Sequence, residues 1–264
     1  ITRGDALDAP FELGRRIEAG ELAGPRIVRA GPYLDGDKPG LPYRVSLASP
    51  ADARRAVGEL ADAGVDFLKV HNLVPREAYL ELARAAHERG LPFAGHIPIS
   101  VTPLEAVAAG QRSIEHLTTF FEAAFVPAKP SDSAALLEVM AEHVEAGLEP
   151  LLAALKREGT WVTPNLIAIE ARARRAEFAR NPDPRLRWIA GSLRRQWDEY
   201  FPVRPEDGRQ EVVAARTRFL ELMLVFARKL HEAGVPLLLG TDLALRDVFP
   251  GASILDELQL LRRA

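Results

Sequence analysis

The chain has 264 residues, enough for a single domain with a large core, and its apolar (47%) and charged (27%) fractions are ordinary for a globular protein. A formal net charge of −3 gives no reason to expect a nucleic acid or an anionic membrane as partner, and no apolar run approaches the roughly 20 residues of a membrane span. There is no cysteine, which excludes a disulfide framework and a thiolate metal site.

The N-terminal part of the chain predicts two helices separated by a strand and a loop. Apolar residues at helical spacing predict the first helix over Pro10–Gly20. Arg26–Ala30 is the first strand candidate, and the Pro- and Gly-rich stretch Gly31–Leu47 predicts a loop. A Ser-Pro pair at 49–50 is typical of a helix start, so we expect a helix over 50–63.

Three apolar segments follow, and each ends in a residue that can bind a metal. They read GVDFLKVHN with Lys69, GLPFAGHIP with His96, and GQRSIEHLT with His116. Helical stretches over 75–89 and 102–109 join them, which is the pattern of successive βα units.

Lys69 lies inside the apolar strand predicted over Val65–Val70. Side chains alternate across a strand, so Lys69 shares one face with His71. A buried lysine loses water, which costs several kcal/mol unless a partner compensates or the pKa of the amine falls. One interpretation is a structural ion pair with a carboxylate. The other is a neutral amine that adds carbon dioxide and becomes a carbamate able to bridge two cations.

His96 and His116 favour the second interpretation. Each stands at the C-terminal end of a predicted strand, where side chains of a closed parallel barrel point into the active site. A single histidine at such a place is more often a satisfied core residue. Two of them, one βα unit apart and after Lys69, indicate a metal site, because neutral imidazoles and carboxylate oxygens both suit zinc.

The rhythm of strands and helices changes in the second half of the chain. Two helices are expected near 134–146 and 149–157, then a strand over Thr160–Asn165. A helical insertion at about 166–234 follows, with an aromatic patch that includes Trp188 and Trp197. We interpret it as a lid or an oligomer contact, with packing against the outer barrel wall as the alternative. The last strand is expected over Val235–Asp242, and a helix follows it.

The segments VDFLKV, FAGHIP, RSIEHL, LLLGTDLA and FPGASILDEL together resemble the amidohydrolase superfamily, from about Glu12 to the end of the chain. The most similar subgroup contains the imidazolonepropionase-like and Xaa-Pro-dipeptidase-like metal hydrolases. The resemblance implies an α/β fold, the (β/α)8 TIM barrel of amidohydrolase type. The family's first strand carries a His-x-His pair that this sequence lacks, so we expect strands three to eight here, with the first two outside the chain.

The resemblance also implies a site. Carboxylated Lys69 would bridge two divalent metal ions, expected to be zinc, His96 and His116 would hold one ion, and Asp242 would contact the other and move protons. Asp242 ends an apolar strand, so we expect its charge to be buried and to need a partner such as a metal. The alternative for Asp242 is an N-cap of the helix after it. His71 stands where relatives often have tyrosine. We interpret His71 and Arg246 as substrate-binding, with a structural histidine and a solvated loop charge as the alternatives.

These features predict a metal-dependent hydrolase that cleaves the C–N bond of an amide, a cyclic amide or a dipeptide. Two alternatives stay open: a lactonase or phosphoesterase with the same binuclear site, and a catalytically inactive barrel that serves as a scaffold subunit. We expect a small-molecule substrate, no nucleic acid partner, no membrane span and a homo-oligomer. We expect a cytoplasmic protein, with a periplasmic or secreted one as the alternative. Three histidines on helices are expected at the surface without chemistry: His87, His143 and His231.

Overall fold

The computed structural model describes residues 5–37, 43–121, 137, 140–144, 148–243 and 245–264. The chain divides into two compact units, Ile1–Val126 with Arg157–Thr160, and Pro127–Lys156 with Trp161–Ala264. Among the described helices, none is long and apolar enough to cross a membrane. Part of the helix expected near 134–146 lies outside the described residues, although 140–144 is helical.

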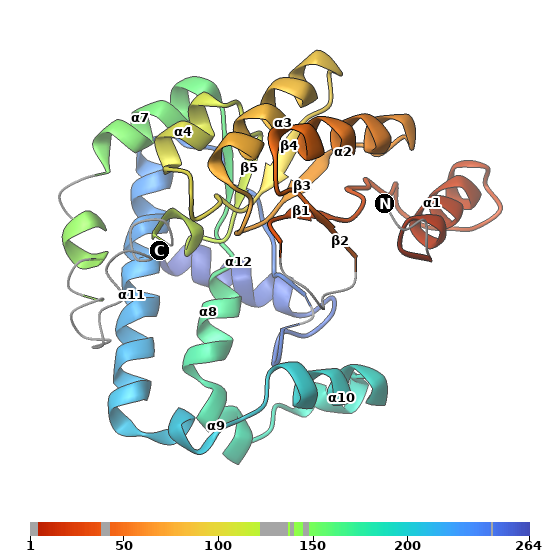
Figure 1. Cartoon of the computed structure of the whole chain (residues 1–264). Helices are drawn as coiled ribbons and strands as arrows, with labels where there is room; N and C mark the ends of the chain where they lie inside the picture. The colour runs from red at the N-terminus through yellow and green to blue at the C-terminus, as the bar shows by residue number, and fades with distance from the viewer. Residues whose placement is uncertain (1–4, 38–42, 122–136, 138–139, 145–147, 244) are drawn as a thin grey trace. The chain divides into compact units, whose positions relative to one another are not determined.

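Five short parallel strands form the centre of the first unit, in the order β2-β1-β3-β4-β5 (Figure 1). Their bounds are β1 Tyr33–Asp35, β2 Arg44–Ser46, β3 Leu68–Val70, β4 Phe93–Gly95 and β5 Ser113–Glu115. Alternation along β3 buries Leu68 and Val70 completely and leaves Lys69 on the other face, as predicted.

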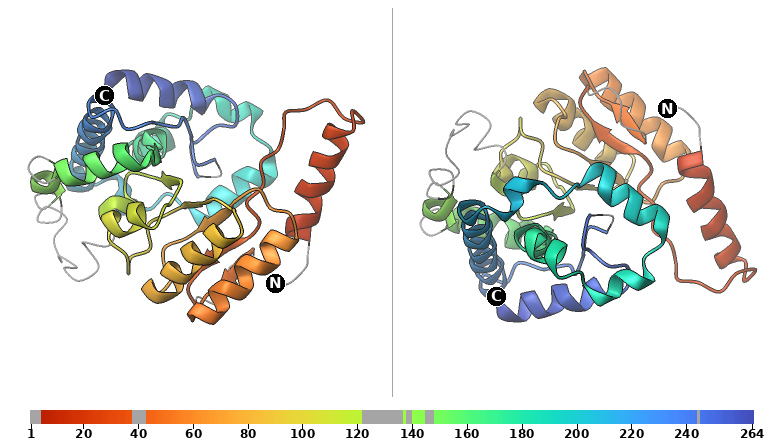
Figure 2. Two further views of the ribbon diagram at one scale, coloured as in Figure 1. Left: turned by 90° about the horizontal axis from the view of Figure 1, so that it is seen from above. Right: turned by 90° about the horizontal axis from the view of Figure 1, so that it is seen from below.

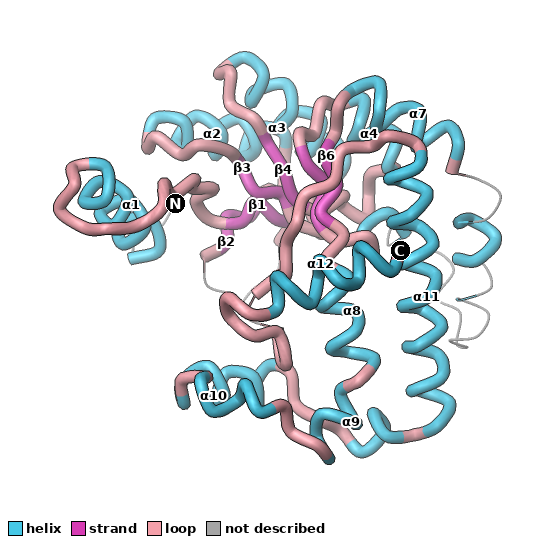
Figure 3. The backbone as a smooth tube through the Cα atoms, turned by 180° about the vertical axis from the view of Figure 1, so that it is seen from behind, coloured by secondary structure: helices cyan, strands magenta, loops and turns pink. Residues whose placement is uncertain are grey.

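Helices connect these strands and cover one face of the sheet (Figures 1 and 3). They are α2 Pro50–Asp62, α3 Arg76–Glu88 and α4 Pro103–Ala108, while α1 Asp5–Glu18 lies beyond the β2 edge. The predicted Ser-Pro start of α2 is confirmed, because the Ser49 hydroxyl accepts the N–H of Asp52 at 3.2 Å. Thr102 and Glu105 form a reciprocal capping box at the start of α4.

The prediction for residues 26–47 was wrong. Arg26–Ala30 is no strand, although the carbonyl of Arg29 accepts hydrogen bonds from the backbone N–H groups of Asp66 at 2.8 Å and Phe67 at 3.4 Å. The first strand is β1, and both β1 and β2 lie in the stretch that was expected to be a loop. The Pro and Gly residues mark the connection between two strands rather than a loop over the whole stretch.

In the second unit, α8 Leu166–Ala173, α11 Gln210–Glu232 and α12 Ser253–Arg263 pack on one another (Figure 2, with α11 and α12 in blue). The other elements of this part of the chain are α7 Glu149–Glu158, β6 Trp161–Thr163, α9 Arg175–Arg180, η1 Pro184–Trp188, α10 Gly191–Tyr200 and η2 Pro205–Gly208. The last predicted strand, Val235–Asp242, pairs with β6 at one parallel bridge, Val162 to Leu237, and is otherwise extended chain.

Candidate functional site

Three histidines and a lysine lie together at the C-terminal ends of neighbouring strands. Lys69 is the middle residue of β3, His71 follows β3, His96 follows β4 and His116 follows β5. The ring centroids of His71 and His96 are 4.3 Å apart, and those of His96 and His116 are 4.6 Å apart and nearly perpendicular. The structure therefore brings together four of the predicted site residues, and we call them the histidine cluster.

Burial in the histidine cluster favours the neutral form of two of its imidazoles, those of His71 and His96. Burial lowers the pKa of His96 far below the ordinary value, and the neighbouring charges of His116, His71 and Lys69 lower it further. Burial is also the largest cause of the lowered pKa of His71, to which Lys69 adds. A neutral imidazole keeps one nitrogen lone pair, which a metal ion or a hydrogen-bond donor can use.

His96 is fixed by its neighbours on β3. Its Nδ1 donates a close hydrogen bond to Oδ1 of Asn72, which leaves the lone pair on Nε2. Its backbone N–H donates to the carbonyl of Val70 at 3.0 Å. The preceding Gly95 has φ of 129°, and a Cβ there would lie 2.2 Å from that same carbonyl oxygen, so only glycine permits this approach of β4 to β3.

His116 adopts a left-handed backbone conformation, with φ of 64°. This region is uncommon for residues other than glycine, and such positions cluster at functional sites. The carbonyl of His116 accepts a hydrogen bond from the Thr119 hydroxyl at 3.0 Å, which helps to hold the turn.

Asp35 and Arg44 support the cluster, and the sequence analysis did not identify either residue. Asp35 ends β1 and is completely buried. Its Oδ2 accepts from Nδ1 of His71 at 3.1 Å and forms a close ion pair with Nη1 of Arg44. Its sequence signal is weak, because Tyr33 and Leu34 are too short an apolar run to predict a strand within a Pro- and Gly-rich stretch.

The cluster offers nitrogen donors of the kind that a metal ion accepts. Among the residues that the structure describes, no group of three or more His, Asp or Glu side chains is arranged to hold an ion. The chemistry of His96 and His116, two adjacent imidazoles, fits an ion such as zinc. Lys69 would supply oxygen donors only as a carbamate, so the donor set of the first unit fits a divalent metal if Lys69 is carboxylated.

Asp242 and Arg246 belong to the second unit. Asp242 is exposed, with φ of 53°, so its expected burial was wrong and its charge needs no partner on that ground. It caps no helix either, because α12 begins only at Ser253. Arg246 pairs with Asp198 of α10 at 2.7 Å. A substrate contact of Arg246 stays a prediction.

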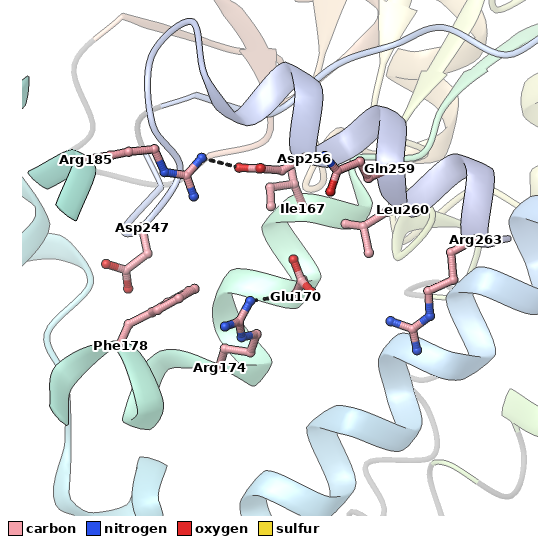
Figure 4. A pocket seen from close by; sticks show the side chains of 10 residues that line it. All are labelled: Ile167, Glu170, Arg174, Phe178, Arg185, Asp247, Asp256, Gln259, Leu260 and Arg263. Atoms are coloured by element: carbon pink, nitrogen blue, oxygen red, sulfur yellow. Dashed lines mark hydrogen bonds and ion pairs between the residues drawn. The ribbon is translucent and has the colours of Figure 1, made fainter. Parts of the chain in front are cut away.

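A cavity of about 350 Å³ lies in the second unit between α8, α9 and α12 (Figure 4). Opposite charges pair along its wall: Arg185 with Asp256 at 2.6 Å, and Arg174 with Glu170 at 3.9 Å. The carboxylate of Asp247 faces the same space, and burial raises its pKa. The Arg185–Asp256 pair connects α12 to η1 of the insertion.

The exposed histidines carry no chemistry in this arrangement. His87, His143 and His231 are all exposed on helices, as predicted. The signal that separates them from the cluster is their place in the chain, since cluster residues follow strands.

No family model and no curated protein matches the chain. Its structure is similar to that of a bottromycin amidohydrolase, with a TM-score of 0.71 and 25% identity over 97% of this chain and 55% of that protein. A Xaa-Pro dipeptidase with methionine bound in its active site is similar with a TM-score of 0.60 and 18% identity, over 98% of this chain and 57% of that protein. A Bifidobacterium longum protein assigned as a prolidase is similar with a TM-score of 0.62 and 18% identity, over 96% of this chain and 53% of that protein.

The chain spans a little over half the length of these proteins. The parallel strands, their covering helices and these likenesses match a partial TIM barrel of the amidohydrolase type. The chain therefore has the fold of the amidohydrolase-type proteins that it resembles in structure.

Proposed function

We propose that the protein is a metal-dependent hydrolase that cleaves a C–N bond in a small amide, a cyclic amide or a dipeptide. The observation that supports this is the histidine cluster, in which the ring centroids of His96 and His116 lie 4.6 Å apart beside a lysine at adjacent strand ends. The similar structures, which include an amidohydrolase and a dipeptidase, support the choice of an amide or peptide bond.

In this proposal each residue has a defined task. His96 and His116 would hold a metal ion through ring nitrogens, and Lys69, once carboxylated, would supply oxygen donors to a site for two divalent ions, with zinc as the expected metal. A bound divalent ion lowers the pKa of water and polarises a carbonyl. Asp242 accepts a proton from the attacking water and returns it to the leaving amine. His71 contacts the substrate.

The test starts with metal analysis of the full-length protein, followed by hydrolysis assays on dipeptides, N-acyl amino acids and lactones. We expect two zinc ions per subunit and hydrolysis of the C–N substrates. Lys69→Ala should lose metal and activity, and added short carboxylic acids should restore part of both. Lys156→Ala, on the exposed side of α7, is the matched control and should behave as the wild type.

Three outcomes would contradict the proposal. Hydrolysis of lactones or phosphoesters alone would reassign the substrate class. Full turnover without metal would remove the proposed role of Lys69, His96 and His116. A metal-loaded protein that hydrolyses none of these compounds would favour a scaffold subunit.

A further inference from the structure

We infer that Asp35 is a positioning residue that holds His71 as its Nδ1–H tautomer, so that Nε2 of His71 accepts a hydrogen bond from a donor group of the substrate. This inference rests on the proposed function only for the substrate contact. The tautomer itself follows from the geometry around Asp35, and it can be measured without any turnover.

The two oxygens of Asp35 have different partners. Oδ1 accepts the backbone N–H groups of Leu73 at 2.7 Å and Gly36 at 2.9 Å. These bonds hold the turn after β1 against the loop after β3, where the chains approach so closely that a Cβ on Gly36 would lie 2.0 Å from the carbonyl of Leu73. Oδ2 has the two side-chain partners, His71 and Arg44. Oδ1 of Asp35 thus holds the loop in place, and Oδ2 orients the imidazole of His71.

Arg44 makes a neutral His71 compatible with a buried carboxylate. A completely buried charge needs a compensating charge, and without Arg44 the imidazole would have to supply it by binding a proton. The Arg44 side chain is itself only 8% exposed and pairs with Oδ2 of Asp35. Because Arg44 neutralises Asp35, His71 can donate Nδ1–H as a neutral ring and keep the lone pair of Nε2.

The ring of His71 lies next to His96, one of the proposed metal ligands. His71 lies between Tyr33, at a centroid distance of 5.5 Å, and His96, at 4.3 Å. The side chain of His71 is 25% exposed, whereas Asp35 is completely buried. Nδ1 faces the buried Asp35, so Nε2 lies on the edge of the ring that points away from Asp35. A neutral Nε2 only accepts, so the matching substrate group is an ammonium, an amide N–H or a hydroxyl.

The substitution Asp35→Asn distinguishes the role of Oδ1 from the role of Oδ2. Asparagine keeps one oxygen for the N–H groups of Leu73 and Gly36, but it places an NH₂ donor against His71. That donor can pair only with a nitrogen lone pair, so the ring must move its proton to Nε2, the change that an Asp-to-Asn substitution causes in a serine protease triad. Asp66→Asn is the matched control, because Asp66 also binds a backbone N–H and an arginine, both of Arg29, but contacts no histidine.

The first experiment measures the tautomer directly. The zinc-loaded full-length protein is labelled with ¹⁵N-histidine, and the His71 signal is identified by its loss in His71→Ala. We expect an Nδ1–H signal in the wild type and in Asp66→Asn, and an Nε2–H signal in Asp35→Asn, with His96 unchanged. An Nε2–H signal in the wild type, or an unchanged signal in Asp35→Asn, would overturn the inference.

The second experiment measures the substrate contact. Asp35→Asn should raise KM about 10-fold and change kcat less than about 3-fold, because a binding contact is lost. In the His71→Ala background the same substitution should change KM less than about 2-fold, since Asp35 acts through His71. Equal effects of Asp35→Asn in both backgrounds would overturn the inference. If no substrate is hydrolysed, the proposed function fails, while the tautomer experiment still decides the role of Asp35.

Discussion

The buried carboxylate of Glu257 accepts a hydrogen bond from the backbone N–H of Ile167 at 2.6 Å, across 90 residues of sequence. Its other oxygen accepts the N–H of Leu166 at 3.0 Å. Glu257 lies on α12 and is completely buried, and its two partners begin α8 directly after β6. The first N–H groups of a helix have no acceptor within the helix, so the carboxylate of Glu257 supplies acceptors for the N–H groups at the start of α8.

Glu257 predicts a pH-dependent stability. Burial is the largest cause that raises its pKa, from 4.5 to about 7, although the backbone N–H groups oppose the shift. The folded state therefore binds this proton more tightly than the unfolded state. Its contribution is fully present below pH 4.5 and is lost as the pH rises through 7, by up to about 3 kcal/mol. Urea unfolding between pH 4.5 and 8 should show this loss in the wild type.

Glu257→Gln should remove that dependence, because glutamine does not titrate. Glu232→Gln makes the same change at an exposed position on α11, and it should keep the wild-type dependence of stability on pH. Parallel pH profiles for the wild type and Glu257→Gln would show that Glu257 titrates normally in the folded protein.

Asn72 predicts a change in metal affinity. Its Oδ1 accepts Nδ1–H of His96 and so directs Nε2 of that ring. Removing such a partner typically lowers metal affinity about 10- to 100-fold. We therefore expect Asn72→Ala to weaken zinc binding by that factor in chelator competition. Asn72→Asp keeps an acceptor oxygen and should bind zinc about as tightly as the wild type. Equal affinity of all three proteins would exclude this role.

Local signals in the sequence predicted β3, β4 and β5 and the capped starts of α2 and α4. Short apolar runs and Ser-Pro or Thr-Pro pairs act within a few residues, so they can be recognised without the fold. Asp35 could not be identified this way, because its role depends on β1 pairing with β3 and on Arg44 from β2. The burial expected for Asp242 failed for a similar reason, since apolar neighbours in sequence do not determine what covers a strand end.

The two tryptophans of the insertion predict a contrast in stability. Trp197 is 1% exposed and packs with Ile189 and Phe249, while Trp188 is 76% exposed beside Arg187. Trp197→Ala should lower the free energy of unfolding by about 3–5 kcal/mol, and Trp188→Ala by less than about 1 kcal/mol. We propose that the insertion shapes substrate access, so Trp197→Ala should also change KM more than metal content. Loss of metal in Trp197→Ala at unchanged KM would contradict this.

Asp242 predicts a variant that binds metal but turns over slowly. Asparagine tolerates the left-handed backbone of this position but cannot carry a proton between water and the leaving amine. Asp242→Asn should stay folded and largely metal-loaded, with kcat lowered at least about 100-fold. The measurement is turnover together with metal content on the same sample. Near-normal turnover would leave Asp242 without a part in the reaction.

At strand ends with a left-handed backbone, the residue that is best for stability differs from the residue proposed for function. His116 after β5 has φ of 64°, where glycine is unstrained and histidine loses about 1 kcal/mol or more, whereas Asn165 after β6 and Asp242 are residue types that adopt this region more readily. A thermostability selection without an activity screen should therefore favour His116→Gly. Such a selection would yield a more stable protein by deleting a proposed metal ligand.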